Sequence, residues 1–260
     1  MVESSSPIIA NEEDHVVWDN ANYKHWKKNA KYLYDVLIAE ELDWPSLTVD
    51  WFIDSKNSTG KSEQRLLLGT QTSDESANYI KIMKLVRPTM QATDISSSTY
   101  DHDTKEVGGY GKGGTGVQLV ETIKMVHEGE VNVARSNPNN KFLVGSMSPN
   151  GTVLIFDYTK HPSTPADLVA RPQFRCVGHS EEGFGLCWDP HSAARLLSGA
   201  NDGKVCVWDL PKSTAEEQKV EPTLSCTAHS GPVNDVAWHT LYPHLFGSAG
   251  DDGCLLLHDP

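Results

Sequence analysis

Three segments of this chain share one internal spacing, and that repeat constrains the fold more than any other feature. Nineteen residues after each starting histidine comes a serine, and 23 residues after it comes Asn or Asp followed by Gly. An aspartate follows 30 residues after the histidine. The starting histidines are His127, His179 and His229, and their serines are Ser146, Ser198 and Ser248. A fixed period of this length indicates a repeat architecture built from stacked units.

Each unit is predicted to be a small antiparallel sheet. In the middle copy, short apolar runs are separated by Asp189-Pro190 and Asn201-Asp202-Gly203. Short runs bounded by such turn residues are typical of strands, and Asp-Gly favours a tight hairpin. A fourth run, residues 173–177, leads into the next unit. Four strands with a Gly-His start and a Trp-Asp end resemble a WD repeat, which is one blade of a β-propeller.

The recurring polar residues have a structural role in a WD blade, as the resemblance implies. They form a hydrogen-bonded chain that ties a loop, a turn and two strands together, here His179, Ser198, Asp202 and Trp208. The sequence predicts a complete chain only in this middle copy. The first copy has Asn150 and Phe156 instead, and the third has His258 in place of Trp. We therefore expect the first and third copies to be held less firmly.

The same residue types allow two chemical alternatives. Ser, His and Asp are the nucleophile, base and orienting group of a hydrolase. However, the set occurs in three parallel copies, and no G-x-S-x-G turn accompanies it. The repeated histidines are no better as metal ligands, because the chain has no H-x-x-x-H or paired C-x-x-C spacing. The sequence therefore predicts neither catalytic residues nor a metal or other cofactor.

Charge limits the class of partner. The chain has 35 acidic and 22 basic residues and a formal net charge of −13. This balance disfavours direct binding to nucleic acid, which requires a basic face, and it favours basic partners. The alternative is that the acidity serves only solubility. Neither a signal peptide nor a membrane-spanning segment is predicted, and the scattered cysteines suit a reducing compartment, so cytosol or nucleus is expected.

The chain divides into three predicted regions. Residues 1–11 are expected to be disordered. Residues 12–43 are expected to form an amphipathic helix, since apolar residues recur at i, i+4, i+7, i+8 and i+11 from Trp26. Residues 44–260 are predicted to form propeller blades, with a flexible insertion at 87–116. The predicted fold class is thus all-β, a partial WD-repeat propeller of about four blades preceded by an N-terminal helix.

Three segments give a closer resemblance. Residues 23–29 (Tyr-Lys-His-Trp-Lys-Lys-Asn), 44–48 (Trp-Pro-Ser-Leu-Thr) and 156–163 (Phe-Asp-Tyr-Thr-Lys-His-Pro-Ser) resemble the histone-binding WD-repeat family. That family comprises the retinoblastoma-binding proteins and the small subunit of chromatin assembly factor. Its propeller has seven blades, so the resemblance implies a chain cut short after about four. It also implies a non-catalytic, nuclear subunit of chromatin assembly, acetyltransferase, deacetylase or Polycomb-type complexes, with the cytoplasm left open.

The resemblance implies a first histone-binding surface on the loops that follow the repeated histidines. Matching or adjacent positions are Glu128, Glu130, Asn132, Glu181, Glu182, Phe184, Asn234, Asp235 and Asp251. Carboxylates there would bind Lys and Arg of an extended histone tail through charge-assisted hydrogen bonds. Asn234 stands where the family has Glu, which removes one charge. The alternative is that these are ordinary solvated charges.

A second implied surface is a groove beside the N-terminal helix, which takes a histone helix. Its apolar wall would be Leu33, Tyr34, Leu37 and Ile38. The opposite wall belongs to a late blade that this sequence lacks, and Ala30-Lys31 replaces the family's Thr-Pro. We expect such a half-groove to bind weakly.

Two other functions compete with histone binding. WD propellers also serve as substrate receptors of ubiquitin ligases, often with a Trp-Asp-x-Arg motif, but Trp208-Asp209-Leu210-Pro211 lacks the Arg. A non-functional truncated fragment is the other alternative.

Overall fold

The computed structural model describes residues 21–26, 29, 42–58, 60–72, 76–88, 100–101, 106–107, 118–212, 218–227 and 229–260. The chain forms two compact units, Met1–Glu41 with Arg87–Val117, and Leu42–Val86 with Gln118–Pro260. In the first unit, residues 21–26 and 29 are helical. Two short strands, β4 (Tyr100–Asp101) and β5 (Glu106–Val107), pair antiparallel.

Several predictions fall on residues that the structure does not describe. These are the disordered start at 1–11, most of the insertion at 87–116, and the groove residues Leu33, Tyr34, Leu37 and Ile38. Within the described part of the chain, no helix is both long and apolar enough to cross a membrane.

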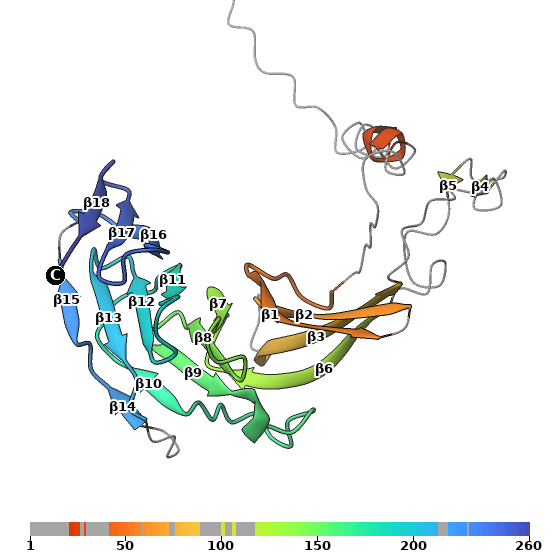
Figure 1. Cartoon of the computed structure of the whole chain (residues 1–260), viewed down its shortest axis with the longest axis horizontal. Coiled ribbons are helices and arrows are strands. Elements are labelled where there is room, and N and C mark those ends of the chain that lie inside the picture. The colour runs from red at the N-terminus through yellow and green to blue at the C-terminus, as the bar shows by residue number, and fades with distance from the viewer. Residues whose placement is uncertain are drawn as a thin grey trace, which may run out of the picture. The chain divides into compact units, whose positions relative to one another are not determined.

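The second unit consists of four sheets in chain order, which we call blades 1 to 4 (Figure 1). Blade 1 contains β1 (Val49–Ser58), β2 (Lys61–Gly69), β3 (Asn78–Pro88) and β6 (Gln118–His127). Blade 2 contains β7 (Val133–Ser136), β8 (Leu143–Met147), β9 (Val153–Asp157) and β10 (Phe174–Cys176). The short 3-10 helix η2 (Tyr158–Lys160) follows β9.

Blade 3 contains β11 (Gly185–Trp188), β12 (Arg195–Gly199), β13 (Val205–Asp209) and β15 (Leu224–Cys226). Blade 4 has three strands, β16 (Val233–Trp238), β17 (Phe246–Gly250) and β18 (Leu255–His258). One further strand, β14 (Gln218–Val220), leaves the connection between β13 and β15 and pairs parallel to β10 of blade 2. The predicted fold class, an all-β partial WD-repeat propeller with an N-terminal helix, is confirmed.

The blades are held together by apolar residues that alternate along their strands. Three clusters of buried side chains fill the joints, and each draws its residues mainly from two successive blades. In the joint between blades 3 and 4, for example, Val205 and Val207 of β13 pack with Val236 and Trp238 of β16. Because alternate residues of a strand face opposite sides, each blade presents one apolar face to each neighbour.

Polar contacts reinforce the first two joints. Thr48 Oγ1 accepts a hydrogen bond from the amide of Ala134 at 3.0 Å, and Asp50 Oδ2 accepts one from the amide of Ser136 at 2.8 Å. Trp188 Nε1 donates to the carbonyl of Arg135 at 3.0 Å. These bonds fix the register of one blade against the next, since each joins a side chain of one blade to the backbone of its neighbour.

The repeated Asn-Gly and Asp-Gly turns adopt the left-handed conformation that the sequence pattern indicates. Gly151, Gly203 and Gly253 have φ of 80°, 72° and 74°. A Cβ on Gly203 would lie 2.8 Å from the carbonyl oxygen of His229 in the next unit. A Cβ on Gly253 would meet nothing within 4 Å. The two glycines therefore share one backbone strain but differ in packing.

This difference predicts unequal costs for the same substitution. Gly253→Ala should lower the free energy of unfolding by about 1 kcal/mol, the cost of a left-handed alanine. Gly203→Ala should cost roughly 1–2 kcal/mol more, because the loop of blade 4 must also shift. Urea unfolding of the two variants beside the parent chain measures both values. Equal losses would show that the turn of blade 3 does not pack against the next loop as described.

Candidate functional site

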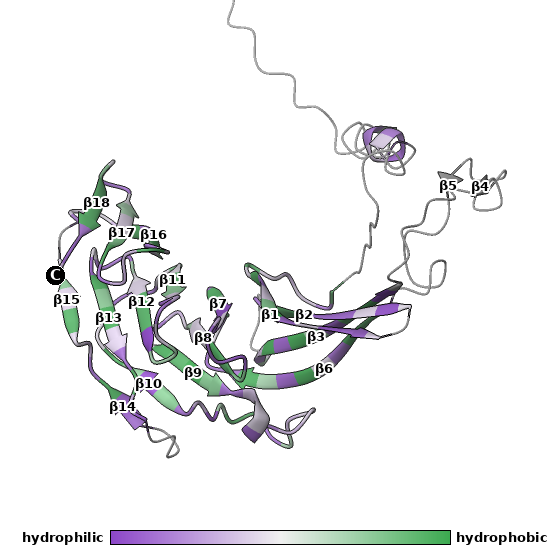
Figure 2. Cartoon of the chain, viewed as in Figure 1, coloured by the Kyte–Doolittle hydropathy of each residue, from purple (hydrophilic) through white to green (hydrophobic). Residues whose placement is uncertain are grey.

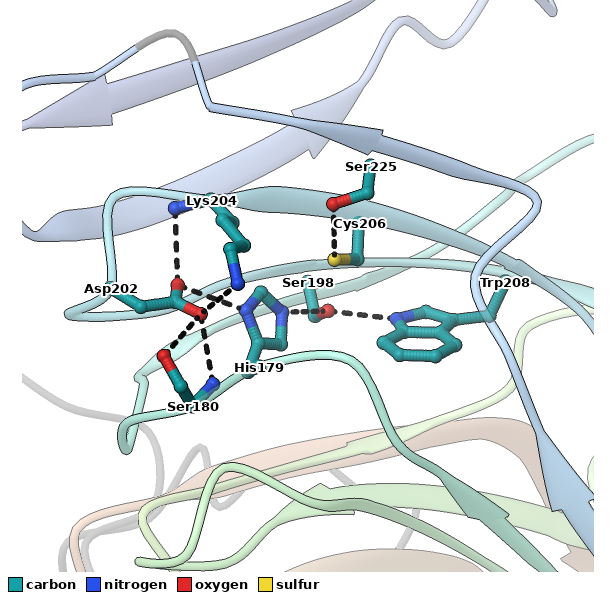
Figure 3. A network of polar contacts seen from close by, with 8 residues as sticks. All are labelled: His179, Ser180, Ser198, Asp202, Lys204, Cys206, Trp208 and Ser225. Carbon is teal, nitrogen blue, oxygen red and sulfur yellow. Dashed lines mark hydrogen bonds and ion pairs between the residues drawn. The ribbon is translucent and has the colours of Figure 1, made fainter.

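The four repeated polar residues of blade 3 form one continuous chain of hydrogen bonds (Figure 3). Trp208 Nε1 lies 2.8 Å from Ser198 Oγ, and Ser198 Oγ lies 2.8 Å from His179 Nε2. His179 Nδ1 lies 3.1 Å from Asp202 Oδ1. An indole only donates and a carboxylate only accepts, so the bonds run in one direction, from Trp208 through Ser198 and His179 to Asp202.

This chain fixes the loop that carries the acidic residues. The second oxygen of Asp202 accepts a hydrogen bond from the amide of Ser180 at 2.9 Å, which anchors the start of the loop. Burial lowers the pKa of His179 and keeps its ring neutral, so Nε2 can accept the hydroxyl proton of Ser198. Ser198 itself is fully buried beneath Trp208, which leaves no approach for a substrate carbonyl.

The prediction that the third copy lacks a complete chain is wrong. His229 Nδ1 lies 3.0 Å from Asp252 Oδ1, and His229 Nε2 lies 2.8 Å from Ser248 Oγ. The position of the Trp is taken by His258, whose Nε2 lies 2.8 Å from the same Ser248 Oγ. A neutral imidazole with its proton on Nε2 donates as an indole does, so the chain closes with the same direction.

The smaller ring of His258 is compensated on the neighbouring strand. His258 stacks on Phe246 with ring centroids 4.7 Å apart. At the corresponding position blade 3 has Leu196, paired with Trp208 across the strands. A large–small pair thus becomes a small–large pair, and the space between the strands stays filled.

The first copy differs as the sequence indicates. His127 Nδ1 lies 2.9 Å from the carbonyl of Gly129, and its Nε2 lies 3.0 Å from Ser146 Oγ. Asn150 does not reach the histidine and instead accepts from the amide of Thr152 at 2.9 Å. Phe156 is fully buried and offers no donor. Here the histidine fixes its own loop through a backbone carbonyl.

Burial lowers the pKa of His127 from 6.5 to about 4, and this shift predicts a pH dependence of stability. Between these two values the unfolded chain binds the extra proton, so the free energy of unfolding falls as the pH falls. From pH 7 to pH 5 the contribution of His127 to that loss is about 2 kcal/mol. Urea unfolding at both pH values should show a smaller loss for His127→Gln than for the parent chain.

The control for this measurement is His244→Gln, since His244 is exposed on the β16–β17 connection. Its loss between the two pH values should equal that of the parent chain. A parent-sized loss in His127→Gln would contradict the assignment of a buried neutral imidazole.

The candidate binding residues lie on the loops that these chains anchor, just after each repeated histidine. Asn132 Nδ2 of the first loop donates to Glu182 Oε2 of the second at 3.1 Å, which joins the loops of blades 2 and 3. The same Nδ2 lies 3.4 Å from the carbonyl of Gly183. Asn132 is buried, whereas Glu182 is half-buried. The amide therefore orients a carboxylate that solvent still reaches.

A second amide–carboxylate pair lies on blade 4. Asn234 Nδ2 donates to Asp251 Oδ1 at 2.6 Å, and both residues are exposed. Asp235 is exposed beside them, and its Oδ1 accepts the amide of Val236. The pairing of Asn234 with Asp251 gives this departure from the family pattern a physical role, because the amide satisfies one oxygen of the acid and leaves the other open.

The remaining candidates differ in how available they are. Glu128 binds both terminal nitrogens of Arg175 at 2.6 and 2.7 Å, and Arg175 lowers the pKa of Glu128. The charge of Glu128 is thus already balanced. Glu130 is half-buried, while Glu181 and Phe184 are exposed. The partnership of Glu128 with Arg175 has no sequence signal, because the two residues are 47 positions apart on different loops and strands.

The arrangement provides orientated carboxylates and an exposed aromatic ring on anchored loops. Such groups bind cationic side chains through charge-assisted hydrogen bonds and apolar contact. Among the described residues, no group of three His, Cys, Asp or Glu side chains is placed to hold a metal ion.

Comparison with known proteins gives matches along most of the chain. Residues 21–89 match the family model of the histone-binding protein RBBP4 and its counterpart in the CAF1 complex. Residues 170–209 and 220–259 match the WD domain, G-beta repeat. A histone acetyltransferase type B subunit 2 from Mycosarcoma maydis is 40% identical over 251 residues, covering 92% of this chain and 58% of the relative.

A relative of the same name from Aspergillus oryzae is 40% identical over 246 residues, covering 92% of this chain and 56% of the relative. The chain therefore spans less than two thirds of the length of these curated relatives.

Proposed function

Because the chain belongs to the histone-binding WD-repeat family, we propose that it binds a basic histone segment on the anchored acidic loops of blades 2 to 4. The observation that carries the proposal is the half-buried carboxylate of Glu182, held by Asn132 across two blades. An acid fixed in this way loses little conformational freedom when it binds a cation, so more of the interaction contributes to affinity.

The electrostatics of the chain support a cationic ligand. The net charge of −13 attracts basic segments over long range and speeds encounter. At short range, Glu182 and Asp251 each give one oxygen to an asparagine amide and retain lone pairs for Lys or Arg. The exposed ring of Phe184 adds an apolar or cation–π contact.

The proposal extends to the setting in which the chain works. We infer a non-catalytic subunit that presents histones to partner proteins, in the nucleus where histones are assembled. The relatives are named as subunits of a histone acetyltransferase, and a complex of that kind is the proposed context. The weaker histone-helix groove at Leu33, Tyr34, Leu37 and Ile38 stays a prediction.

Removing the orientated carboxylate tests the proposal. Glu182→Gln keeps the shape of the side chain but loses its charge, so the affinity for a Lys- and Arg-rich histone-tail peptide should fall about tenfold. Calorimetric titration at two salt concentrations measures this loss, and the variant should also show a weaker salt dependence.

The matched control is Glu221→Gln, which removes the same charge from an exposed acid on the connection between β14 and β15. This variant should bind the peptide as the parent chain does. Equal losses in the two variants would reduce the effect to net charge and would contradict a built site at Glu182.

Asn234→Glu tests the role of the second amide–carboxylate pair. The change breaks the 2.6 Å bond to Asp251 and places two carboxylates side by side. A bound guanidinium would relieve their repulsion, so the affinity for an Arg-containing peptide should rise several-fold and depend more steeply on salt. Unchanged affinity in the same titration would place the peptide away from blade 4.

A further inference from the structure

The outer face of blade 4 is built like faces that are covered elsewhere in the chain. Leu255 and Leu257 of β18 are each 74% exposed. The residues 50 positions earlier, Val205 and Val207 of β13, are only 1% and 6% exposed, because blade 4 packs over them. Figure 2 shows β18 coloured as hydrophobic along much of its length. We call this surface, Leu255 and Leu257 with Ala237 beside them, the front face of blade 4.

The opposite end of the unit carries the complementary kind of face. Trp51 of β1 pairs with Leu66, in the register that Trp188 has with Leu196 and Trp238 has with Phe246. Trp188 and Trp238 are 4% and 7% exposed in the joints between blades, whereas Trp51 is 52% exposed. Val49 and Ile53 share the strand face of Trp51 and are also exposed. We call these three residues the back face of blade 1.

The internal joint between blades 3 and 4 shows how two such faces fit. There the paired aliphatic residues of β13 pack against Val236 and Trp238 of β16. The front face of blade 4 repeats the β13 half of that joint, with Leu255 and Leu257. The back face of blade 1 repeats the β16 half, with Val49 and Trp51. Each end of this chain is therefore a mate for the other end.

We infer that two copies of this 260-residue chain associate head to tail, with the front face of blade 4 in each copy packed on the back face of blade 1 in the other. One chain cannot make this contact with itself, because both faces are exposed within it. Two identical joints close the assembly, and twice four blades gives a ring within the usual range for propellers.

The burial of large apolar side chains drives the association. Exposed apolar patches of this kind on a soluble chain mark interaction surfaces, and each leucine or tryptophan removed from water contributes favourably. The inference is independent of histone binding, since neither face includes Glu182 or the loop that carries it.

Sedimentation velocity on the purified chain tests the inference. At tens of micromolar the mass should be twice the 28.6 kDa of one chain. Trp51→Glu and Leu257→Glu should each raise the dimer dissociation constant at least about tenfold, because each places a charge in an apolar joint. Leu241→Glu is the control, since Leu241 is an exposed apolar residue on the β16–β17 connection and belongs to neither face.

Mixing the two defective variants separates a head-to-tail joint from any symmetric face-to-face contact. In a mixed pair, one joint combines both substitutions and the other combines two intact faces. The mixture should therefore recover dimer, although each variant alone stays monomeric. Circular dichroism establishes that each variant keeps its β structure. As a second readout, dilution of the parent chain should shift tryptophan emission to longer wavelength, and Trp51→Phe should abolish that shift.

A monomeric parent chain at these concentrations would overturn the inference, and so would open-ended polymers, an equal effect of Leu241→Glu, or a mixture that stays monomeric. Retained peptide binding by Leu257→Glu would show that the loss of dimer is separate from the proposed histone-binding function.

Discussion

A small antiparallel sheet has two faces and can bury neither by itself, so every blade of this chain depends on its neighbours. The joints between successive blades show the solution, in which aliphatic residues of one sheet pack against β-branched and aromatic residues of the next. Stability in such an array comes from nearest-neighbour contacts rather than from one central core. Blades 2 and 3 are covered on both sides, whereas blades 1 and 4 each keep one apolar face in contact with solvent.

The buried polar chains solve a different problem, which is how to give a connecting loop one conformation. A loop that follows an outer strand has few apolar residues to anchor it. In blades 3 and 4 a histidine at the start of the loop bonds a buried serine on one side and the aspartate of a turn on the other. An unpaired buried group would cost roughly 1–3 kcal/mol, so the geometry in which every partner is satisfied dominates. The acidic residues on those loops inherit this fixed position.

Sequence reasoning predicted the regular part of the fold because its signals are local. The alternation of short apolar runs with Asp-Gly turns indicated the strands of blades 2 to 4, and the positive φ of Gly203 fits the turn expected there. The failure at His258 has a clear cause. Sequence comparison between repeats treats Trp and His as different residues, whereas the network requires only an N–H donor at the right distance from Ser248. The compensating exchange of Leu196 for Phe246 lies on another strand and is visible only in three dimensions.

The candidate site divides along the same line between local and long-range information. The acids after each histidine are visible in the sequence, but their partners are not. Glu128 is neutralised by Arg175, Glu182 is orientated by Asn132, and Asp251 is held by Asn234, so three similar acids have three different degrees of availability. A charge already balanced by Arg has less to gain from a ligand than one bound by a neutral amide. Binding to this face should therefore centre on Glu182 and Asp251 rather than follow the number of acidic residues along the loops.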